Sequence, residues 1–296
     1  MKIILNGIGC PHSGARLVLM ELLKTVPDDI ELLAVVPKVS KDDLFSTTSA
    51  NIRFLEMNVK YWSLYLRPVL EIGINLTKLI FKYDAVINVS NYGLCLTKNQ
   101  VLYIHNQFIV DISAKEKIGG GYPNKINRFL LNTYLKKASA IFVQSNHIQK
   151  MLKNYCNHFR ITHPKNVNVI TPLPMIEGFS NLNKIEKNFE FQFFYPASEF
   201  VHKRIDLATD SILAYNKANQ SAGLIITAKG ENDLKNNLIF LGSISHTESL
   251  ERMNSSDAII FTSEREALGL PLLEALYFEK PAILPNLPYA TEIYGD

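Results

Sequence analysis

The chain has 296 residues, of which 47% are hydrophobic and 20% charged, and this composition excludes a disordered protein and leaves room for two domains. The formal net charge of +3 is too small to indicate a nucleic-acid partner. Cys10, Cys95 and Cys156 lie far apart, which excludes a cysteine-based zinc site and suits a reducing compartment. Met1 leads directly into a strand-like run without a signal peptide, so we expect a cytoplasmic protein.

Short apolar runs alternate with helical patterns in the first half of the chain, and this alternation is typical of parallel α/β sheets. The predicted strands cover residues 2–6, 31–36, 85–89, 101–105, 140–144 and 168–170. The predicted helices cover residues 15–25, 61–82, 125–137 and 147–155. A proline-containing break and a polar stretch then predict an inter-domain linker, so that the first domain would cover residues 1–176.

The second half repeats the alternation and predicts another domain over residues 189–296. Its predicted strands cover residues 190–195, 224–228, 238–241 and 257–262. Its predicted helices cover residues 206–217 and 247–253, with one more beginning at Pro271. We therefore expect an α/β protein of two Rossmann-like, doubly wound domains, with a ligand in the cleft between them.

Two carboxylates follow the strand at 257–262, and seven residues separate them. Glu266 falls in the loop after the strand, and Glu274 falls one turn into the next helix on the same side. Ligands of open α/β sheets bind at that edge, where carboxylates can accept hydrogen bonds from the hydroxyls of a sugar or a ribose. The backbone N–H groups of Leu268, Gly269 and Leu270 at the helix start suit an oxygen-rich or anionic ligand.

This segment, from Ser263 to Leu276, resembles the Glu-x7-Glu signature of the retaining glycosyltransferases of family four (glycosyl transferases group 1), which have the GT-B fold. The resemblance continues through Lys280-Pro-Ala-Ile-Leu-Pro285 to Thr291-Glu-Ile-Tyr-Gly-Asp296. It differs from the family pattern in two places, where Ala267-Leu268-Gly269 replaces Gly-Phe-Gly and Glu279 replaces a glycine. The second domain is also shorter than the family pattern, which fits either a minimal version or part of a longer protein.

The resemblance implies roles for residues elsewhere in the chain. Lys203, after the strand at 190–195, matches the family lysine that neutralises the donor diphosphate. Many relatives carry an arginine a few residues earlier, where this chain has Ala197 and Ser198, and Arg204 could supply that second charge. His105, at the end of a strand, resembles the family histidine near the donor sugar, although a lone histidine is more often structural.

The glycine-containing segment Gly7-Ile-Gly9-Cys-Pro-His-Ser-Gly14 matches neither a dinucleotide fingerprint nor a P-loop, because His12 and Arg16 replace required residues. A turn before a helix can still bind a phosphate through its N–H groups, so Ser13 and Gly14 are candidates. A plain strand-to-helix turn is the alternative.

The resemblance implies a glycosyltransferase that moves a sugar, with retention, from a nucleotide diphosphate sugar to an acceptor hydroxyl, in bacterial cell-surface polysaccharide synthesis. Lys203 would stabilise the leaving diphosphate, Glu266 would hold the donor sugar and Glu274 the ribose. We expect no cofactor and no metal, since the chain has no Asp-x-Asp motif. The rival readings are a nucleotide-sugar epimerase on the same fold and a non-catalytic or truncated nucleotide-sugar-binding protein.

The predicted partners are the nucleotide sugar and a glycan or lipid-linked acceptor. Residues 60–70 hold the chain's one tryptophan, two tyrosines and two cations on a predicted amphipathic helix. Such a helix can bind an anionic bilayer, so we expect peripheral association with the inner face of the plasma membrane. A helix that packs its apolar face on the sheet would explain the same residues.

Overall fold

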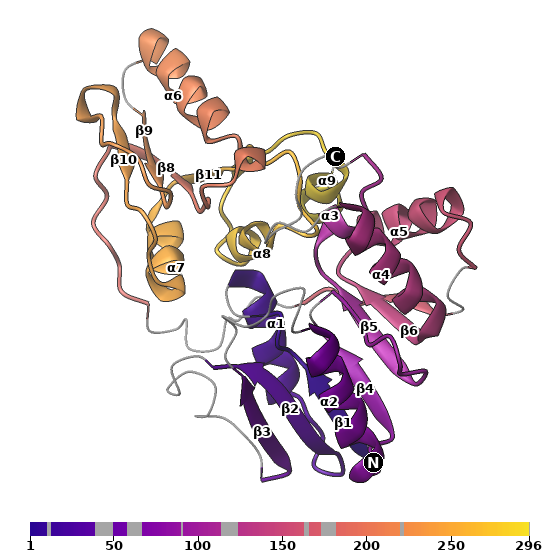
Figure 1. Cartoon of the computed structure of the whole chain (residues 1–296). Coiled ribbons are helices and arrows are strands. Elements are labelled where there is room, and N and C mark those ends of the chain that lie inside the picture. Colours follow the sequence, from indigo (N-terminus) through magenta and orange to yellow (C-terminus); the bar gives the residue numbers. More distant parts are fainter. Residues whose placement is uncertain are drawn as a thin grey trace. The chain divides into compact units, whose positions relative to one another are not determined.

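The computed structural model describes residues 1–10, 13–38, 50–57, 67–89, 91–113, 124–162, 166–172, 182–219 and 222–295, without the side chains of 13–14, 67–70, 124–127 and 219. The chain forms two compact units, Met1–Pro172 and Leu173–Asp296. Figure 1 shows that each unit has its own sheet and its own helices. The first unit ends at Pro172, whereas the sequence predicts a first domain that ends at 176.

The first unit is built on a seven-stranded parallel sheet with the order β3-β2-β1-β4-β5-β6-β7. Its strands are β1 (Lys2–Asn6), β2 (Glu31–Pro37), β3 (Ile52–Met57), β4 (Ala85–Asn88), β5 (Gln100–Ile104), β6 (Ala138–Val143) and β7 (Val167–Val169). The order reverses between β1 and β4, and this switch point is where open α/β sheets form a crevice at the carboxyl ends of their strands.

Successive residues of β1 pack against opposite faces of this sheet, because side chains alternate along a strand. Ile3 and Leu5 join the core formed with α1, whereas Ile4 joins the core that contains Ile74 of α2. The helices of the unit are α1 (Ser13–Lys24), α2 (Arg67–Ile80), α3 (Gln107–Val110), α4 (Asn124–Lys137) and α5 (Asn146–His158). Gly7 lets α1 pack closely on the sheet, since a Cβ at this position would lie 2.6 Å from a methyl carbon of Leu19 and that side chain would have to shift.

The second unit is built on a five-stranded parallel sheet with the order β10-β9-β8-β11-β12. Its strands are β8 (Phe191–Tyr195), β9 (Ala222–Ile226), β10 (Leu238–Phe240), β11 (Ala258–Ile260) and β12 (Ala282–Ile283). Its helical elements are η4 (Val201–Lys203), α6 (Ile205–Asn219), η5 (Leu234–Asn236), α7 (His246–Ser255), α8 (Leu270–Tyr277) and α9 (Pro288–Tyr294). The order reverses between β8 and β11, so these two strands flank the switch point of the second sheet.

The α/β class and the parallel sheets agree with the prediction, and most element bounds differ from it by one to three residues. The sequence analysis missed β3, β12, α3 and α9. Strand β3 has the sequence Ile-Arg-Phe-Leu-Glu-Met, and only its first residue is buried. Its charged residues interrupt the apolar run by which a buried strand is recognised in a sequence. Residues 61–66 of the predicted helix at 61–82 lie outside the described residues, and the helix is described from Arg67 onward.

Candidate active site

The candidate site of the second unit lies at the carboxyl ends of β8 and β11. The segment after β8 carries Lys203 and Arg204, and the loop after β11 carries Glu264 and Glu266. Because β8 and β11 are neighbouring parallel strands, the segments that leave their carboxyl ends meet at one edge of the sheet. The strand order therefore brings together residues that are 63 positions apart, such as Lys203 and Glu266.

Two hydroxyl groups, one on β8 and one just after β11, hold the backbone around Lys203 in place. The carbonyl oxygen of Lys203 accepts a hydrogen bond from the Tyr195 hydroxyl of β8, and the Thr262 hydroxyl lies 3.0 Å from the same oxygen. The Glu264 N–H donates to the His202 carbonyl at 2.8 Å. Burial raises the pKa of Tyr195, so its phenol stays protonated and remains a donor. These bonds fix the position from which the Lys203 side chain projects.

The ammonium group of Lys203 forms an ion pair with Glu266. The two side chains are only 13% and 15% exposed, and the Lys203 Nζ also lies 5.3 Å from the centroid of the Phe261 ring. A cation over an aromatic face is attracted by the ring's quadrupole, which adds to the carboxylate's attraction. Glu266 is therefore a protein partner for the Lys203 cation that the sequence alone did not indicate.

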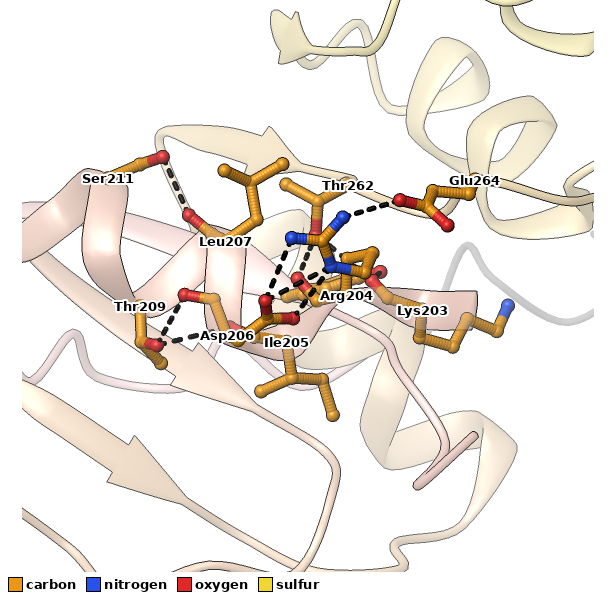
Figure 2. Close-up of polar contacts among 10 residues, drawn as sticks. Lys203, Arg204, Ile205, Asp206, Leu207, Thr209, Ser211, Thr262 and Glu264 are labelled. Carbon is orange, nitrogen blue, oxygen red and sulfur yellow. Dashed lines mark hydrogen bonds and ion pairs between the residues drawn. The ribbon is translucent and has the colours of Figure 1, made fainter. Parts of the chain in front are cut away.

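The Arg204 side chain has other partners than Lys203, because its guanidinium bonds to Asp206 and Glu264 (Figure 2). Arg204 has left-handed backbone geometry (φ 48°) and bonds to both Asp206 oxygens, from Nε at 3.1 and 3.0 Å, and to Glu264. The hydrogen bond from Arg204 holds the pKa of Asp206 below its ordinary value. The Lys203 side chain extends away from this cluster, so the two adjacent cations do not converge on one point.

Glu274, on α8, is buried with 5% exposure and hydrogen-bonds to His246 at the start of α7. The His246 Nε2 lies 2.8 Å from Glu274 Oε1. An N–H at His246 Nε2 can donate to this carboxylate oxygen, and this leaves the second Glu274 oxygen for another donor. Sequence reasoning missed His246, because a lone histidine in Ser-His-Thr-Glu carries no motif.

The start of α8 requires a glycine, because Gly269 is the residue before the helix and has a φ of 80°. Side chains rarely adopt this conformation, whereas glycine does so readily. Among the hydrogen bonds of the described residues, none uses the N–H of Leu268, Gly269 or Leu270 as donor. Such N–H groups at a helix start carry partial positive charge and can donate hydrogen bonds to an anionic or hydroxyl-rich ligand.

In the first unit, His105 directly follows β5 and its ring is bonded to Asn91, which follows β4. Burial lowers the pKa of His105 to about 4, against an ordinary value of 6.5, so the ring is neutral near pH 7. A hydrogen bond with the Val89 backbone opposes this fall. Sequence reasoning did not find Asn91, although asparagine is one of the few residues that tolerate its positive φ of 65°.

The phosphate-binding candidates Ser13 and Gly14 form the first turn of α1, where N–H groups have no intrahelical acceptor. Their side chains lie outside the described ones, as do residues 11 and 12. Among the described residues, no three His, Cys, Asp or Glu side chains gather as metal ligands would, and no helix is long and apolar enough to cross a membrane.

The comparisons with known proteins point to one class. A sequence profile of the family "Glycosyl transferases group 1" matches residues 225–296, a range that contains Glu266 and Glu274. A search among curated proteins gives no match. The profile covers about a quarter of the chain.

Solved structures match nearly the whole chain. Sucrose-phosphate synthase from Thermosynechococcus elongatus has a TM-score of 0.68 at 12% identity, with 97% of this chain and 82% of that chain covered. WaaG, a glycosyltransferase involved in lipopolysaccharide biosynthesis, has a TM-score of 0.68 at 14% identity, with coverages of 99% and 83%. Alr3699/HepE from Anabaena, in complex with UDP-glucose, has a TM-score of 0.64 at 17% identity, with coverages of 99% and 82%. At these identities the likeness shows the fold, which is that of GT-B glycosyltransferases.

Proposed function

We propose that the protein is a retaining GT-B glycosyltransferase of family four that transfers a sugar from a nucleotide diphosphate sugar to an acceptor hydroxyl. The observation that carries the proposal is the pairing of Lys203 with Glu266 at the switch point between β8 and β11. The family profile over residues 225–296 supports it from the sequence, and the likeness to a protein solved with UDP-glucose favours a UDP-linked donor.

Each residue of this site has a separate role in the proposed reaction. The Lys203 ammonium stabilises the charge that develops on the leaving diphosphate, together with the N–H groups of Leu268, Gly269 and Leu270. The Glu266 carboxylate accepts hydrogen bonds from the donor sugar, and Glu274 accepts from the ribose with the oxygen that His246 leaves open. Both carboxylates therefore bind substrate, which favours a front-face mechanism without a protein nucleophile.

Donor binding changes the partner of Lys203. Before the donor binds, Glu266 neutralises the ammonium group in a largely buried pair. A diphosphate offers Lys203 a stronger negative charge than Glu266 does, while the sugar hydroxyls donate hydrogen bonds to Glu266. The ion pair therefore holds both side chains in place for the donor, with Lys203 ready for its diphosphate and Glu266 for its sugar. Arg204, which is bonded to Asp206 and Glu264, has to give up carboxylate partners before it can contact the diphosphate. No cofactor and no metal is required by this scheme.

The proposed acceptor is a glycan or a lipid-linked glycan in cell-surface polysaccharide synthesis, and the first unit is the acceptor side, with Ser13, Gly14 and His105 at the carboxyl edge of its sheet. Peripheral contact with the inner face of the plasma membrane would bring this unit to a lipid-linked acceptor. Large apolar side chains on α2 support the contact, since Ile72, Leu76, Leu79 and Ile80 are each about half exposed or more.

A donor panel separates the proposal from its rivals. Release of nucleoside diphosphate from UDP-, ADP- and GDP-linked sugars would be measured with and without glycan acceptors, and binding would be measured by calorimetry in parallel. NMR of the product gives the anomeric configuration of the transferred sugar. Turnover with the same configuration as in the donor supports retention. Binding without turnover would instead indicate a nucleotide-sugar-binding protein, and an epimerised free donor would indicate an epimerase.

A further inference from the structure

The side chain of Asn91 is held by three hydrogen bonds to His105 and Asn106. Its side-chain oxygen accepts two backbone hydrogen bonds, from the His105 N–H at 2.7 Å and the Asn106 N–H at 3.0 Å. Two backbone donors identify this atom as oxygen, so the orientation of the amide is not ambiguous. The NH₂ group of Asn91 then faces the ring, with its Nδ2 2.8 Å from His105 Nε2.

This geometry determines which ring nitrogen of His105 carries the proton. An amide NH₂ can only donate, so Nε2 must accept and is therefore unprotonated. A neutral imidazole carries one proton on its two ring nitrogens, so with Nε2 unprotonated that proton lies on Nδ1.

The surroundings reinforce a neutral ring. Two titratable groups of the described residues lie near this cluster: Tyr103, whose ring centroid lies 6.3 Å from that of His105, and Cys10, whose thiol contacts the Val89 carbonyl. Burial raises the pKa of each to about 12, so neither is charged at neutral pH. Asn91 itself is 7% exposed and has left-handed backbone geometry, and the loop after it is packed around Gln100, which bonds to Leu94 and Thr97.

We propose that Asn91 is a positioning residue that holds the His105 imidazole as the neutral tautomer protonated on Nδ1, so that His105 acts as a fixed, uncharged surface of the site and not as a proton carrier. The role of His105 in transfer rests on the function proposed above, whereas the tautomer does not. His105 is then not free to carry a proton, because Nε2 cannot take one up without breaking the hydrogen bond that Asn91 donates to it.

Nitrogen NMR of the full chain tests the proposal without any substrate. In histidine-labelled protein, long-range ¹H–¹⁵N correlation distinguishes a protonated from an unprotonated ring nitrogen, and a His105→Gln variant identifies the His105 signals among those of the seven histidines. We expect an unprotonated Nε2 and a protonated Nδ1 that do not change between about pH 5.5 and 8. Protonation on Nε2, or a titration midpoint near the ordinary value, would overturn the proposal.

Two variants separate positioning from a purely structural role. Asn91→Asp keeps an oxygen for the two backbone N–H groups but turns an acceptor toward Nε2, so the unprotonated Nε2 signal should be lost. Asn91→Gly tolerates the positive φ and removes the amide, so both tautomers should appear. An unchanged His105 tautomer in either folded variant would refute the role of Asn91. If Asn91→Asp does not fold, Asn91→Gly and the wild-type spectrum still decide. A chain that shows this tautomer but transfers no sugar would refute only the proposed function.

Discussion

Lys203 and Glu266 form a largely buried ion pair across the switch point of the second sheet, with the Lys203 ammonium also over the Phe261 ring. A buried pair of this kind is a weak source of stability, because desolvation of both charges offsets much of their attraction. Its position at the carboxyl ends of β8 and β11, where ligands of such sheets bind, gives it a different use. Both charges are held in place before a ligand arrives.

We expect Lys203→Ala to reduce kcat about 10²–10³-fold, because one preorganised charge on the leaving group is worth about 2–4 kcal/mol. The variant should also lose about 1–3 kcal/mol of unfolding free energy, since Glu266 is left largely buried without its partner. Turnover of the accepted donor and urea unfolding would be measured together.

Lys187→Ala is the matched control for Lys203→Ala. Lys187 pairs with Asp257 at 2.9 Å in the same unit, but these residues precede β8 and β11 and lie at the opposite ends of the strands. Both side chains are about a third exposed, so the control should cost at most about 1 kcal/mol and leave kcat unchanged. Equal kcat in wild type and Lys203→Ala would refute the proposed role of Lys203.

We expect the two glutamates to separate by the part of the donor that each contacts. Glu274→Gln should weaken the binding of free nucleoside diphosphate and of the sugar donor alike, by the about 1.5–3 kcal/mol that a hydrogen bond to a charged group contributes. Glu266→Gln should spare the free nucleotide and reduce turnover, because its proposed partner is the sugar. Calorimetry with nucleoside diphosphate and with the sugar donor measures both effects, and equal losses of nucleotide affinity would contradict the assignment.

His246→Ala refines the same comparison. This histidine bonds to Glu274 at 2.8 Å, so its loss should weaken nucleotide binding without touching the sugar subsite. The expected loss is smaller than that of Glu274→Gln, because the carboxylate itself remains. A His246→Ala variant with reduced kcat but unchanged nucleotide affinity would place the histidine in another role.

Turnover should persist in EDTA, because Lys203 and the N–H groups at the start of α8 supply the positive charge that a metal would otherwise bring to the diphosphate. The rate of nucleoside diphosphate release would be measured before and after chelation. Complete loss of turnover that Mg²⁺ or Mn²⁺ restores would show that a metal carries the diphosphate.

The low pKa of His105, about 4 in the folded chain, predicts a pH-dependent stability. The unfolded chain takes up a proton near pH 6.5 and the folded chain only near pH 4, so stability falls as the pH drops through this window. The slope contributed by His105 is at most about 1.4 kcal/mol per pH unit. In His105→Gln this contribution is absent, so the stability difference between the variant and wild type should shrink or reverse from pH 7 to pH 5. Parallel urea curves at both pH values would contradict the prediction.

The sequence predicted the sheets because buried parallel strands are continuous apolar runs, as in Ile-Ile-Leu of β1 and Leu-Ile-Ile of β9. It placed Glu266 and Glu274 correctly in a loop and on a helix, because the strand before them and Pro271 between them are local signals. It could not predict the partners of Lys203, Arg204 and Glu274. Those contacts depend on strand order, and the neighbours of β8 are known only once the chain is folded.

Asn91 illustrates the same limit in the first unit. Its importance depends on a positive φ and on two N–H groups that lie 14 and 15 residues further along the chain. Neither is visible in the sequence, where Asn91 resembles an ordinary loop residue. The sequence did place His105 at a strand end, which is where the structure has it, but the pattern carried no information on its protonation.

Finally, we expect the first unit to bind anionic membranes through α2. The predicted membrane segment at 60–70 lies mostly outside the described residues. However, α2 and the residue after it have exposed large apolar side chains: Ile72 is 48% exposed, Phe81 62% and Leu79 72%. Lys82 lies exposed beside them. Apolar side chains next to cations suit an anionic bilayer surface, and the charge contribution should weaken with salt.

Co-sedimentation with liposomes of increasing anionic lipid content tests this prediction. Binding of the wild-type chain should rise with anionic lipid and fall with salt, and Leu79→Glu should reduce it, because a carboxylate on the apolar face opposes both contributions. Leu234→Glu is the matched control, since Leu234 is 68% exposed but belongs to the second unit, and it should bind as wild type does. Absence of binding to anionic liposomes at low salt, or equal binding by wild type and Leu79→Glu, would rule out α2 as the membrane-binding surface.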